Sequence, residues 1–89
     1  MLFVRNADVV VEDLGACFSL VHQMPVIVLY DKPNDYPDAV IARLFDASVP
    51  TRFIAKGRTL EEVRRAIPHG MSYIQRDEHD SKTIIGCFV

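Results

Sequence analysis

The sequence predicts an α+β domain: a small mixed or antiparallel sheet of about five strands with one helix packed on it. Short apolar runs bounded by proline and glycine are typical of strands, because such runs are too short for helices. Residues 60–67 carry a complete set of helix signals. With 89 residues, the chain is long enough for one domain but too short to bury two separate cores.

We expect residues 24–89 to form this single domain and residues 1–23 to be an N-terminal extension of it. Residues 2–4 are apolar and predict a short strand. A weaker helix follows, because apolar side chains recur there at helical spacing, and Asp8 is a candidate cap for its start. These apolar side chains are Val10, Leu14, Cys17, Phe18 and Val21.

The first three strands of the domain follow one another closely. Residues 26–30 are a continuous apolar run, and residues 31–38 form a loop, because two prolines there oppose both helix and strand. Residues 39–46 alternate with apolar side chains on both faces, which predicts a central strand. A turn at 48–50 then leads into a third strand at 51–55.

The helix is predicted to begin with a capping box. In this motif the Thr59 hydroxyl accepts a hydrogen bond from the Glu62 N–H, and the Glu62 carboxylate accepts one from the Thr59 N–H. An apolar stripe that runs to Ile67 faces the sheet. The Pro-His-Gly sequence at 68–70 ends the helix.

Two more strands, at 71–75 and 83–89, lie on either side of a polar loop at 76–82. The third and fourth strands flank the helix, so we expect them to be parallel and joined by a right-handed crossover. The strands next to them in the sequence are expected to pair with them as hairpins.

The composition favours a protein partner. Apolar residues make up 49% of the chain, so part of the apolar surface is expected to be buried against another chain or a second copy. A net charge of −2 gives no basic surface for nucleic acid. The two cysteines fit no metal or redox motif, which predicts free thiols in a cytoplasmic protein. No stretch is typical of a signal peptide or long enough to span a membrane.

The loop at 31–38 supplies the candidate partner-binding residues. Its carboxylates are the ligand type for a hard cation, but EF-hand spacing is absent, which favours a rigid turn without metal. Two tyrosines at this loop are expected to be exposed, where aromatic side chains suit contact with a partner. The predicted partner-binding residues are Tyr30, Asp31, Asp35, Tyr36 and Asp38.

No residue is expected to be catalytic or to bind a metal. Residues 77–80 place a histidine among three acids, but consecutive residues cannot all face one ion. His69 follows the helix, where it is typical of a structural cap, and Cys87 belongs to no motif with a histidine. No known catalytic or nucleotide-binding motif occurs. We therefore expect neither enzymatic activity nor a cofactor.

The last strand is the candidate association edge. Residues 83–89 are mostly apolar and carry no charged side chain. If the strand lies at the edge of the sheet, its unpaired backbone groups can bind another strand. We expect Ile84, Ile85 and Phe88 to take part in a homo-oligomer, unless residues 1–23 cover this edge.

From residue 24 onward, the sequence resembles a group of small phage and prophage proteins of Gram-positive bacteria. The resemblance rests on residues 30–37, 40–43 and 59–71 and on Arg76, Asp77 and Asp80. Because no activity is assigned to that group, the resemblance implies a mobile-element accessory protein and carries over no site residue.

These features together predict a non-enzymatic protein-binding module that docks on a host or phage protein, for example as an inhibitor of a host defence protein. The alternative is a small-molecule-binding protein, or a small enzyme whose site is completed at a dimer interface, because so small a domain has little room for a pocket of its own.

Overall fold

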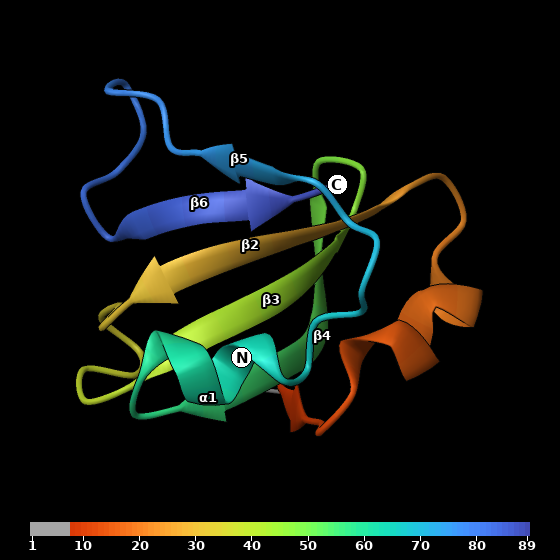
Figure 1. The fold of residues 1–89 in the computed structure, drawn as a ribbon, viewed down its shortest axis with the longest axis horizontal. Coiled ribbons are helices and arrows are strands. Elements are labelled where there is room, and N and C mark those ends of the chain that lie inside the picture. Colours follow the sequence, from red (N-terminus) through yellow and green to blue (C-terminus); the bar gives the residue numbers. More distant parts are fainter. Residues whose placement is uncertain (1–7) are drawn as a thin grey trace, which may run out of the picture.

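The computed structural model describes residues 8–89, which form one six-stranded sheet with two short helical segments (Figure 1). In chain order the elements are β1 (Val9–Val10), η1 (Leu14–Leu20), β2 (Pro25–Asp31), β3 (Val40–Asp46), β4 (Val49–Gly57), α1 (Leu60–Arg64), β5 (Tyr73–Gln75) and β6 (Ile84–Phe88). The order across the sheet is β1-β4-β3-β2-β6-β5, with β1 parallel to β4 and all other neighbours antiparallel. The predicted α+β fold is confirmed, and of the two predicted alternatives, mixed or antiparallel, the sheet is mixed.

The centre of the sheet follows from the apolar pattern of β2 and β3, which pair along their whole length. β3 turns into β4 at Ala47, whose φ of 55° is left-handed. The turn predicted at 48–50 is therefore displaced, because Val49 and Pro50 already belong to β4. Proline is tolerated near the start of this strand, in a part of β4 that β1 does not pair with.

α1 has the predicted start but ends earlier than predicted. Thr59 caps it by accepting a hydrogen bond from the Glu62 N–H at 3.2 Å; the return bond to the Glu62 carboxylate does not occur among residues 8–89. The α-helix stops at Arg64, and residues 65–67 continue as a tighter turn in which N–H groups bond to carbonyls three residues back. This turn still buries Ile67 in the core.

The N-terminal segment contains the predicted helix as a 3-10 helix, η1, with Leu14 and Cys17 buried. Asp8 is not its cap. Asp13 caps it instead, because the Asp13 carboxylate accepts a hydrogen bond from the Gly15 N–H at 2.9 Å. The strand predicted at residues 2–4 lies outside the described residues.

Two predictions about strand order are wrong. β4 and β5 run in the same direction, but β3, β2 and β6 lie between them, so they are not neighbours. β6 is not an edge strand, because it pairs with β2 on one side and β5 on the other. Ile84, Ile85 and Phe88 therefore form no open association edge, and Phe88 is buried in the core. The described part of the N-terminal segment, from residue 8, pairs with β4 through β1, at the opposite end of the sheet from β5 and β6.

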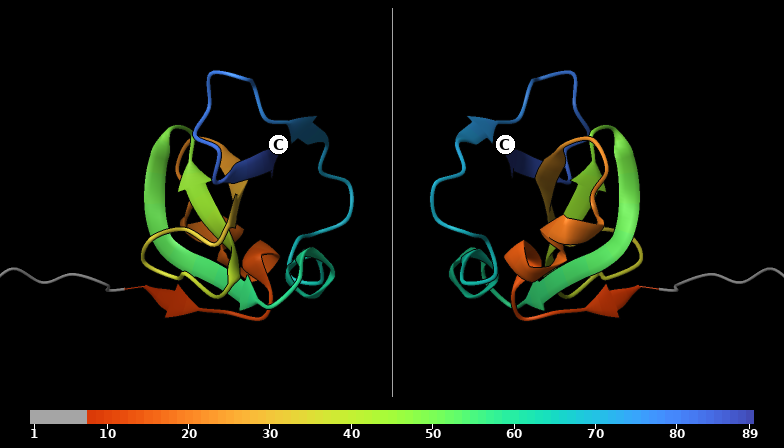
Figure 2. Two further views of the ribbon diagram at one scale, coloured as in Figure 1. Left: turned by 90° about the vertical axis from the view of Figure 1, so that its left-hand side faces the viewer. Right: turned by 90° about the vertical axis from the view of Figure 1, so that its right-hand side faces the viewer.

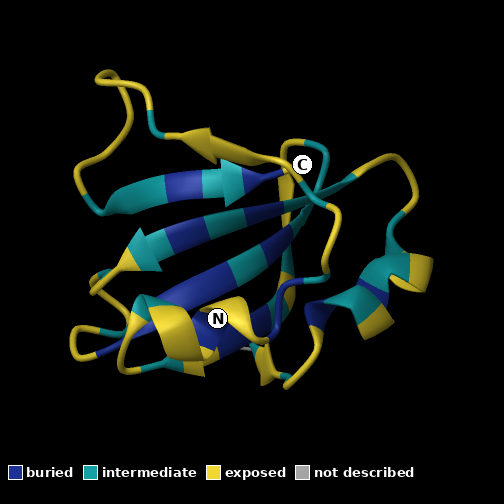
Figure 3. Ribbon diagram, viewed as in Figure 1, coloured by how far each residue is buried: buried dark blue, intermediate teal, exposed yellow. Residues whose placement is uncertain are grey.

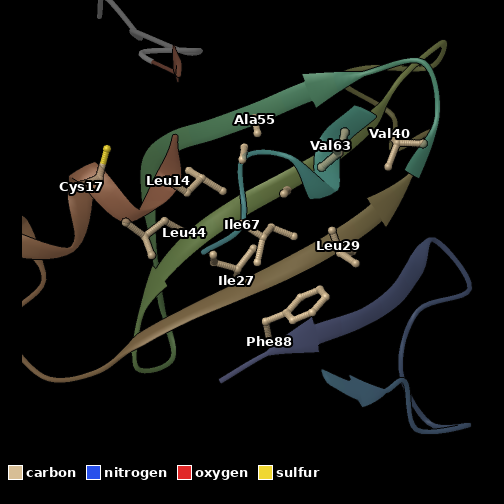
Figure 4. Packing of buried hydrophobic residues seen from close by; sticks show 12 residues of the cluster. Leu14, Cys17, Ile27, Leu29, Val40, Leu44, Ala55, Val63, Ile67 and Phe88 are labelled. Carbon is tan, nitrogen blue, oxygen red and sulfur yellow. The ribbon is translucent and has the colours of Figure 1, made fainter. Parts of the chain in front are cut away.

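Both helical segments lie on the same face of the sheet (Figure 2), and the larger cluster of buried residues joins them to it. Figure 3 shows buried residues along β2 and β3 and exposed residues along β5. Figure 4 shows Leu14 of η1 and Val63 and Ile67 of the α1 region grouped with Leu29 and Leu44 of the sheet. Neither helical segment of the described chain covers the opposite face, which we call the outer face.

Candidate functional site

The register of the strands identifies the side chains on the outer face, because residues directly opposite each other share a face. Arg43 of β3 lies opposite Val28 of β2. Val28 in turn lies opposite Cys87 of β6, and Cys87 lies opposite Ile74 of β5. The chain neighbours of Val28 are both buried in the core, so this row of side chains points to the outer face.

Part of the outer face is apolar. Val28, Ile74, Ile84 and Cys87, which we call the outer apolar patch, line an open hollow of about 380 Å³. Ile74 is 49% exposed, and the other three side chains are half-buried. The patch is therefore an accessible apolar surface at the end of the sheet that β5 and β6 form.

A polar cluster lies on the same face, towards β1. It consists of Asp8, Tyr36, Arg43 and Thr51, and we call it the Arg43 site. The Arg43 guanidinium donates hydrogen bonds to both carboxylate oxygens of Asp8, each at 2.9 Å, and to the Thr51 carbonyl at 2.7 Å. The Tyr36 hydroxyl donates to the same carboxylate at 2.9 Å. Since the Arg43 and Asp8 side chains are only 17% and 14% exposed, the carboxylate is bound in a partly buried, charge-assisted site.

Local structure positions each member of this site. Arg43 alternates along β3 with apolar side chains that fix its direction. The loop after β2 folds back through a hydrogen bond from the Tyr36 N–H to the Pro33 carbonyl, and the Tyr36 ring packs against a small buried cluster that includes Ile54. Asp8 directly precedes β1, whose parallel pairing with β4 brings the carboxylate to Arg43.

The electrostatics favour the ionised pair. The hydrogen bonds from Arg43 hold the pKa of the Asp8 carboxyl below its ordinary value of 3.8, although burial acts in the opposite direction. The hydrogen bond to Asp8 raises the pKa of Arg43. Burial, followed by the bond to Asp8, raises the pKa of the Tyr36 hydroxyl, and burial raises that of Tyr30. A tyrosine with a raised pKa stays protonated, so it serves as a hydrogen-bond donor rather than as a general base.

An open hollow of about 760 Å³ adjoins the Arg43 site. Tyr30, Asp35 and Arg52 line it together with the members of the site. Lys56 lies outside the lining, with its Nζ 5.2 Å from the centre of the Tyr36 ring. Among the described residues, the lining includes no cysteine, histidine, serine or lysine. What the arrangement offers is recognition of a charged or hydrogen-bonding group.

The structure brings three of the predicted partner-binding residues, Tyr30, Asp35 and Tyr36, to this hollow and leaves Asp31 and Asp38 outside it. All three acids are exposed. The expectation that the tyrosines are exposed is wrong, because both are half-buried and pack against the cluster that contains Ile54.

The remaining candidate residues have structural roles or no partner in a site. The Asp80 carboxylate accepts from the Asp77 N–H, and the Asp77 carboxylate accepts from the His79 N–H, so these acids close their own turn. Within residues 8–89, no group of three acidic, histidine or cysteine side chains could hold a metal ion. His69 is exposed after α1. Cys17 and Cys87 are free thiols, and burial raises the pKa of both.

Sequence reasoning missed the Asp8–Arg43 pair that forms the centre of the site. The available signal was Arg43 itself, a charged residue between apolar residues in a strand that was predicted to be central. A buried guanidinium requires an anion, but the sequence did not show which of its acids would supply it.

The helical segments of residues 8–89 are short: η1 has seven residues and α1 has five. Neither has the length and apolar character needed to cross a membrane. No protein-family model, curated protein or solved structure matches this chain.

Proposed function

We propose that this chain is a non-enzymatic protein-binding module that docks on a partner protein through its outer face. The observation that carries this proposal is the outer apolar patch of Val28, Ile74, Ile84 and Cys87, which lies on the face that neither helical segment covers within residues 8–89. Covering the patch would remove apolar surface from water, which favours association.

The partner in this proposal is a phage protein or a protein of the phage's host, since the sequence resembles phage and prophage proteins from residue 24 onward. Inhibition of a host defence protein is one form that such binding takes. A net charge of −2 argues against nucleic acid as the ligand. The two free thiols agree with a cytoplasmic protein. We also include self-association in the proposal, because the sheet has an exposed edge at β5.

Affinity capture with matched surface variants tests the proposal. The full chain is used as bait in a lysate of a Gram-positive bacterium. Ile74→Lys places a charge in the outer apolar patch, whereas Leu20→Lys places the same charge on η1, where Leu20 is 59% exposed. We expect a protein that the wild type and Leu20→Lys capture and Ile74→Lys does not. If Ile74→Lys captures the same proteins as the wild type, the patch is not the docking surface.

A small-molecule-binding protein, or an enzyme completed at a dimer interface, is the second candidate. The hollow of about 760 Å³ beside Arg43 and Arg52 favours it, because its size and the two guanidinium groups in a mixed polar and apolar lining suit a small anionic ligand. A thermal-shift screen of metabolites with the wild type and Arg52→Ala separates the two functions. A ligand that stabilises the wild type but not Arg52→Ala, with no captured protein, would support this candidate.

A further inference from the structure

We propose that the Arg43 site and the adjoining edge of β4 bind an extended segment of a partner protein that carries a carboxylate, and that Asp8, Val9 and Val10 occupy this site as an intramolecular ligand. The site involves β3 and β4, whereas Ile74 lies on β5 at the opposite end of the sheet. The inference therefore goes beyond the docking surface proposed above and does not depend on it.

The first step is the recognition of the carboxylate. Arg43 and Tyr36 place three donors around one carboxylate group, at 2.9 Å each. This bidentate guanidinium contact, with the Tyr36 hydroxyl as a third donor, is specific for a planar anion such as a carboxylate. Nothing in the geometry requires that the carboxylate belong to the same chain, since Asp8 and Arg43 are 35 positions apart in the sequence.

The second step is that Arg43 needs an anion. Without Asp8 the guanidinium keeps its bond to the Thr51 carbonyl but loses its bidentate carboxylate. The exposed Asp35 lines the same hollow and acts on Arg43 through its charge, with no hydrogen bond between the two among the described residues. The guanidinium is 17% exposed with Asp8 in place, and its bond to the Thr51 carbonyl keeps it at this position when Asp8 leaves, so a carboxylate regains there a charge-assisted contact. A carboxylate from another chain would therefore be favoured at this position once Asp8 leaves.

The third step is that Asp8 is attached to a short strand with little burial. β1 has two residues, and Val9 and Val10 are 41% and 59% exposed. Besides the pairing of these two residues with β4, one hydrogen bond joins the Val11 N–H to the Ile54 carbonyl at 2.8 Å. Short strands with exposed side chains open at low free-energy cost.

The fourth step is that the edge of β4 can accept a longer strand. β4 has nine residues, but β1 lies opposite only Phe53 and Ile54. A guest strand could pair with more of this edge by β-strand addition. The intramolecular ligand, Asp8 followed by Val9 and Val10, also indicates the sequence expected of the partner segment. That sequence is an acidic residue followed by β-branched residues, which favour a strand.

Fluorescence anisotropy with the full-length chain tests this inference. Asp8→Lys sets a like charge against Arg43, which should release the N-terminal segment. The probe is a fluorescein-labelled peptide with the sequence of residues 8–13, and its control carries asparagine in place of the first aspartate. We expect Asp8→Lys to bind the acidic peptide about tenfold more tightly than the control, as one charge-assisted contact predicts. The wild type should bind it more weakly, because its own segment competes at a high effective concentration.

Adding Tyr36→Phe to Asp8→Lys should reduce the preference for the acidic peptide. Equal affinity for the two peptides, or no binding of either, would overturn the inference. If circular dichroism shows that Asp8→Lys does not fold, the near-isosteric Asp8→Asn replaces it. The same preference for the acidic peptide is then expected, and the same results would overturn the inference.

Light scattering of the wild type and Asp8→Asn tests whether the site instead binds the N-terminal segment of a second copy of the chain. A dimer that is lost in Asp8→Asn would place that segment in the site and overturn the inference. If Ile74→Lys abolishes the capture of a protein but the peptides give no preference, only this inference fails and the proposed docking face stands.

Discussion

The phenol ring of Tyr73 lies across Gly86, in the space where any other residue would place its Cβ atom. A Cβ atom at Gly86 would lie 2.7 Å from Cε1 of Tyr73 and 2.7 Å from the Ile74 carbonyl oxygen. The Tyr73 hydroxyl donates a hydrogen bond to the Ile85 carbonyl at 3.2 Å, and its ring centre lies 5.2 Å from that of Phe88. An aromatic side chain of the edge strand thus covers a glycine of its neighbour and joins β5 to β6.

Gly86→Ala is expected to lower the free energy of unfolding by about 1–3 kcal/mol, because the added methyl group must displace the Tyr73 ring and the β5 backbone. Urea unfolding measures this loss. In a Tyr73→Ala background the same substitution should cost less, since the close contacts with the Tyr73 ring and hydroxyl are gone and only that with the Ile74 carbonyl remains. Equal costs in the two backgrounds would show that the Tyr73 ring does not constrain position 86.

Thr59→Ala is expected to lower the free energy of unfolding by about 1 kcal/mol, because the Glu62 N–H loses its acceptor at the start of α1. Thr59→Ser keeps a hydroxyl in the same position and is the matched control, so it should unfold close to the wild type. Urea unfolding curves of Thr59→Ala and the wild type that coincide would show that the cap does not stabilise the fold.

The strands β2 and β3 could be predicted from the sequence because their signal is local. Continuous apolar runs between prolines, and alternation with apolar residues on both faces, determine a strand without reference to the rest of the chain. The position of β6 could not be predicted in this way. Whether β6 lies at the edge depends on where the three residues of β5 pair. All three are exposed, so their sequence carries no pattern of burial that would place β5 beside β6. Strand order depends on such non-local contacts.

The site was predicted only in part, for the same reason. The sequence predicts Tyr36 to be an exposed aromatic residue, but in the structure its hydroxyl is a donor in a partly buried carboxylate site. The local sequence favours Asp8 as a helix cap, because apolar side chains at helical spacing follow it. Its partner Arg43 lies on another strand, and only the pairing of β1 with β4 brings the two together.

Asp46 is expected to make stability depend on pH in the acid range. Its carboxylate accepts hydrogen bonds from the N–H groups of His22, Gln23 and Met24 at 2.9, 2.8 and 3.3 Å. These bonds, with that from His22 as the largest cause, hold the pKa of Asp46 below its ordinary value of 3.8. A carboxyl with a lower pKa in the folded than in the unfolded state stabilises the fold above the unfolded pKa, and this contribution is lost as the pH falls through the folded pKa.

The difference in unfolding free energy between the wild type and Asp46→Asn should therefore be largest near neutral pH and shrink as the pH falls below 3.8, the ordinary pKa of the carboxyl. Urea unfolding over this range measures it. Asp38→Asn, at an exposed position in the loop after β2, is the matched control for loss of one acid. A difference for Asp46→Asn that stays constant down to the acid limit would contradict the assignment.

Self-association remains a prediction, but the structure moves it from β6 to the exposed edge at β5. The Ser72 N–H and carbonyl both bond to Val89, at 2.8 and 2.9 Å, so Ser72 and Val89 are a hydrogen-bonded pair. In an antiparallel ladder such pairs alternate, which points the backbone groups of Ile74 towards β6 and those of Tyr73 and Gln75 away from it. These outward groups can bind a strand of a second copy.

Gln75→Pro removes one outward N–H without removing a hydrogen bond between β5 and β6, and edge strands tolerate proline at such positions. We expect the wild type to form dimers at micromolar concentration in light scattering, and Gln75→Pro to be monomeric with a similar melting temperature. Gln75→Ala keeps the N–H and is the matched control, so it should still dimerise. If all three proteins are monomers, the β5 edge is too short to pair with another chain. If all three are dimers, association uses another surface, and the outer apolar patch can then be examined with Ile74→Lys.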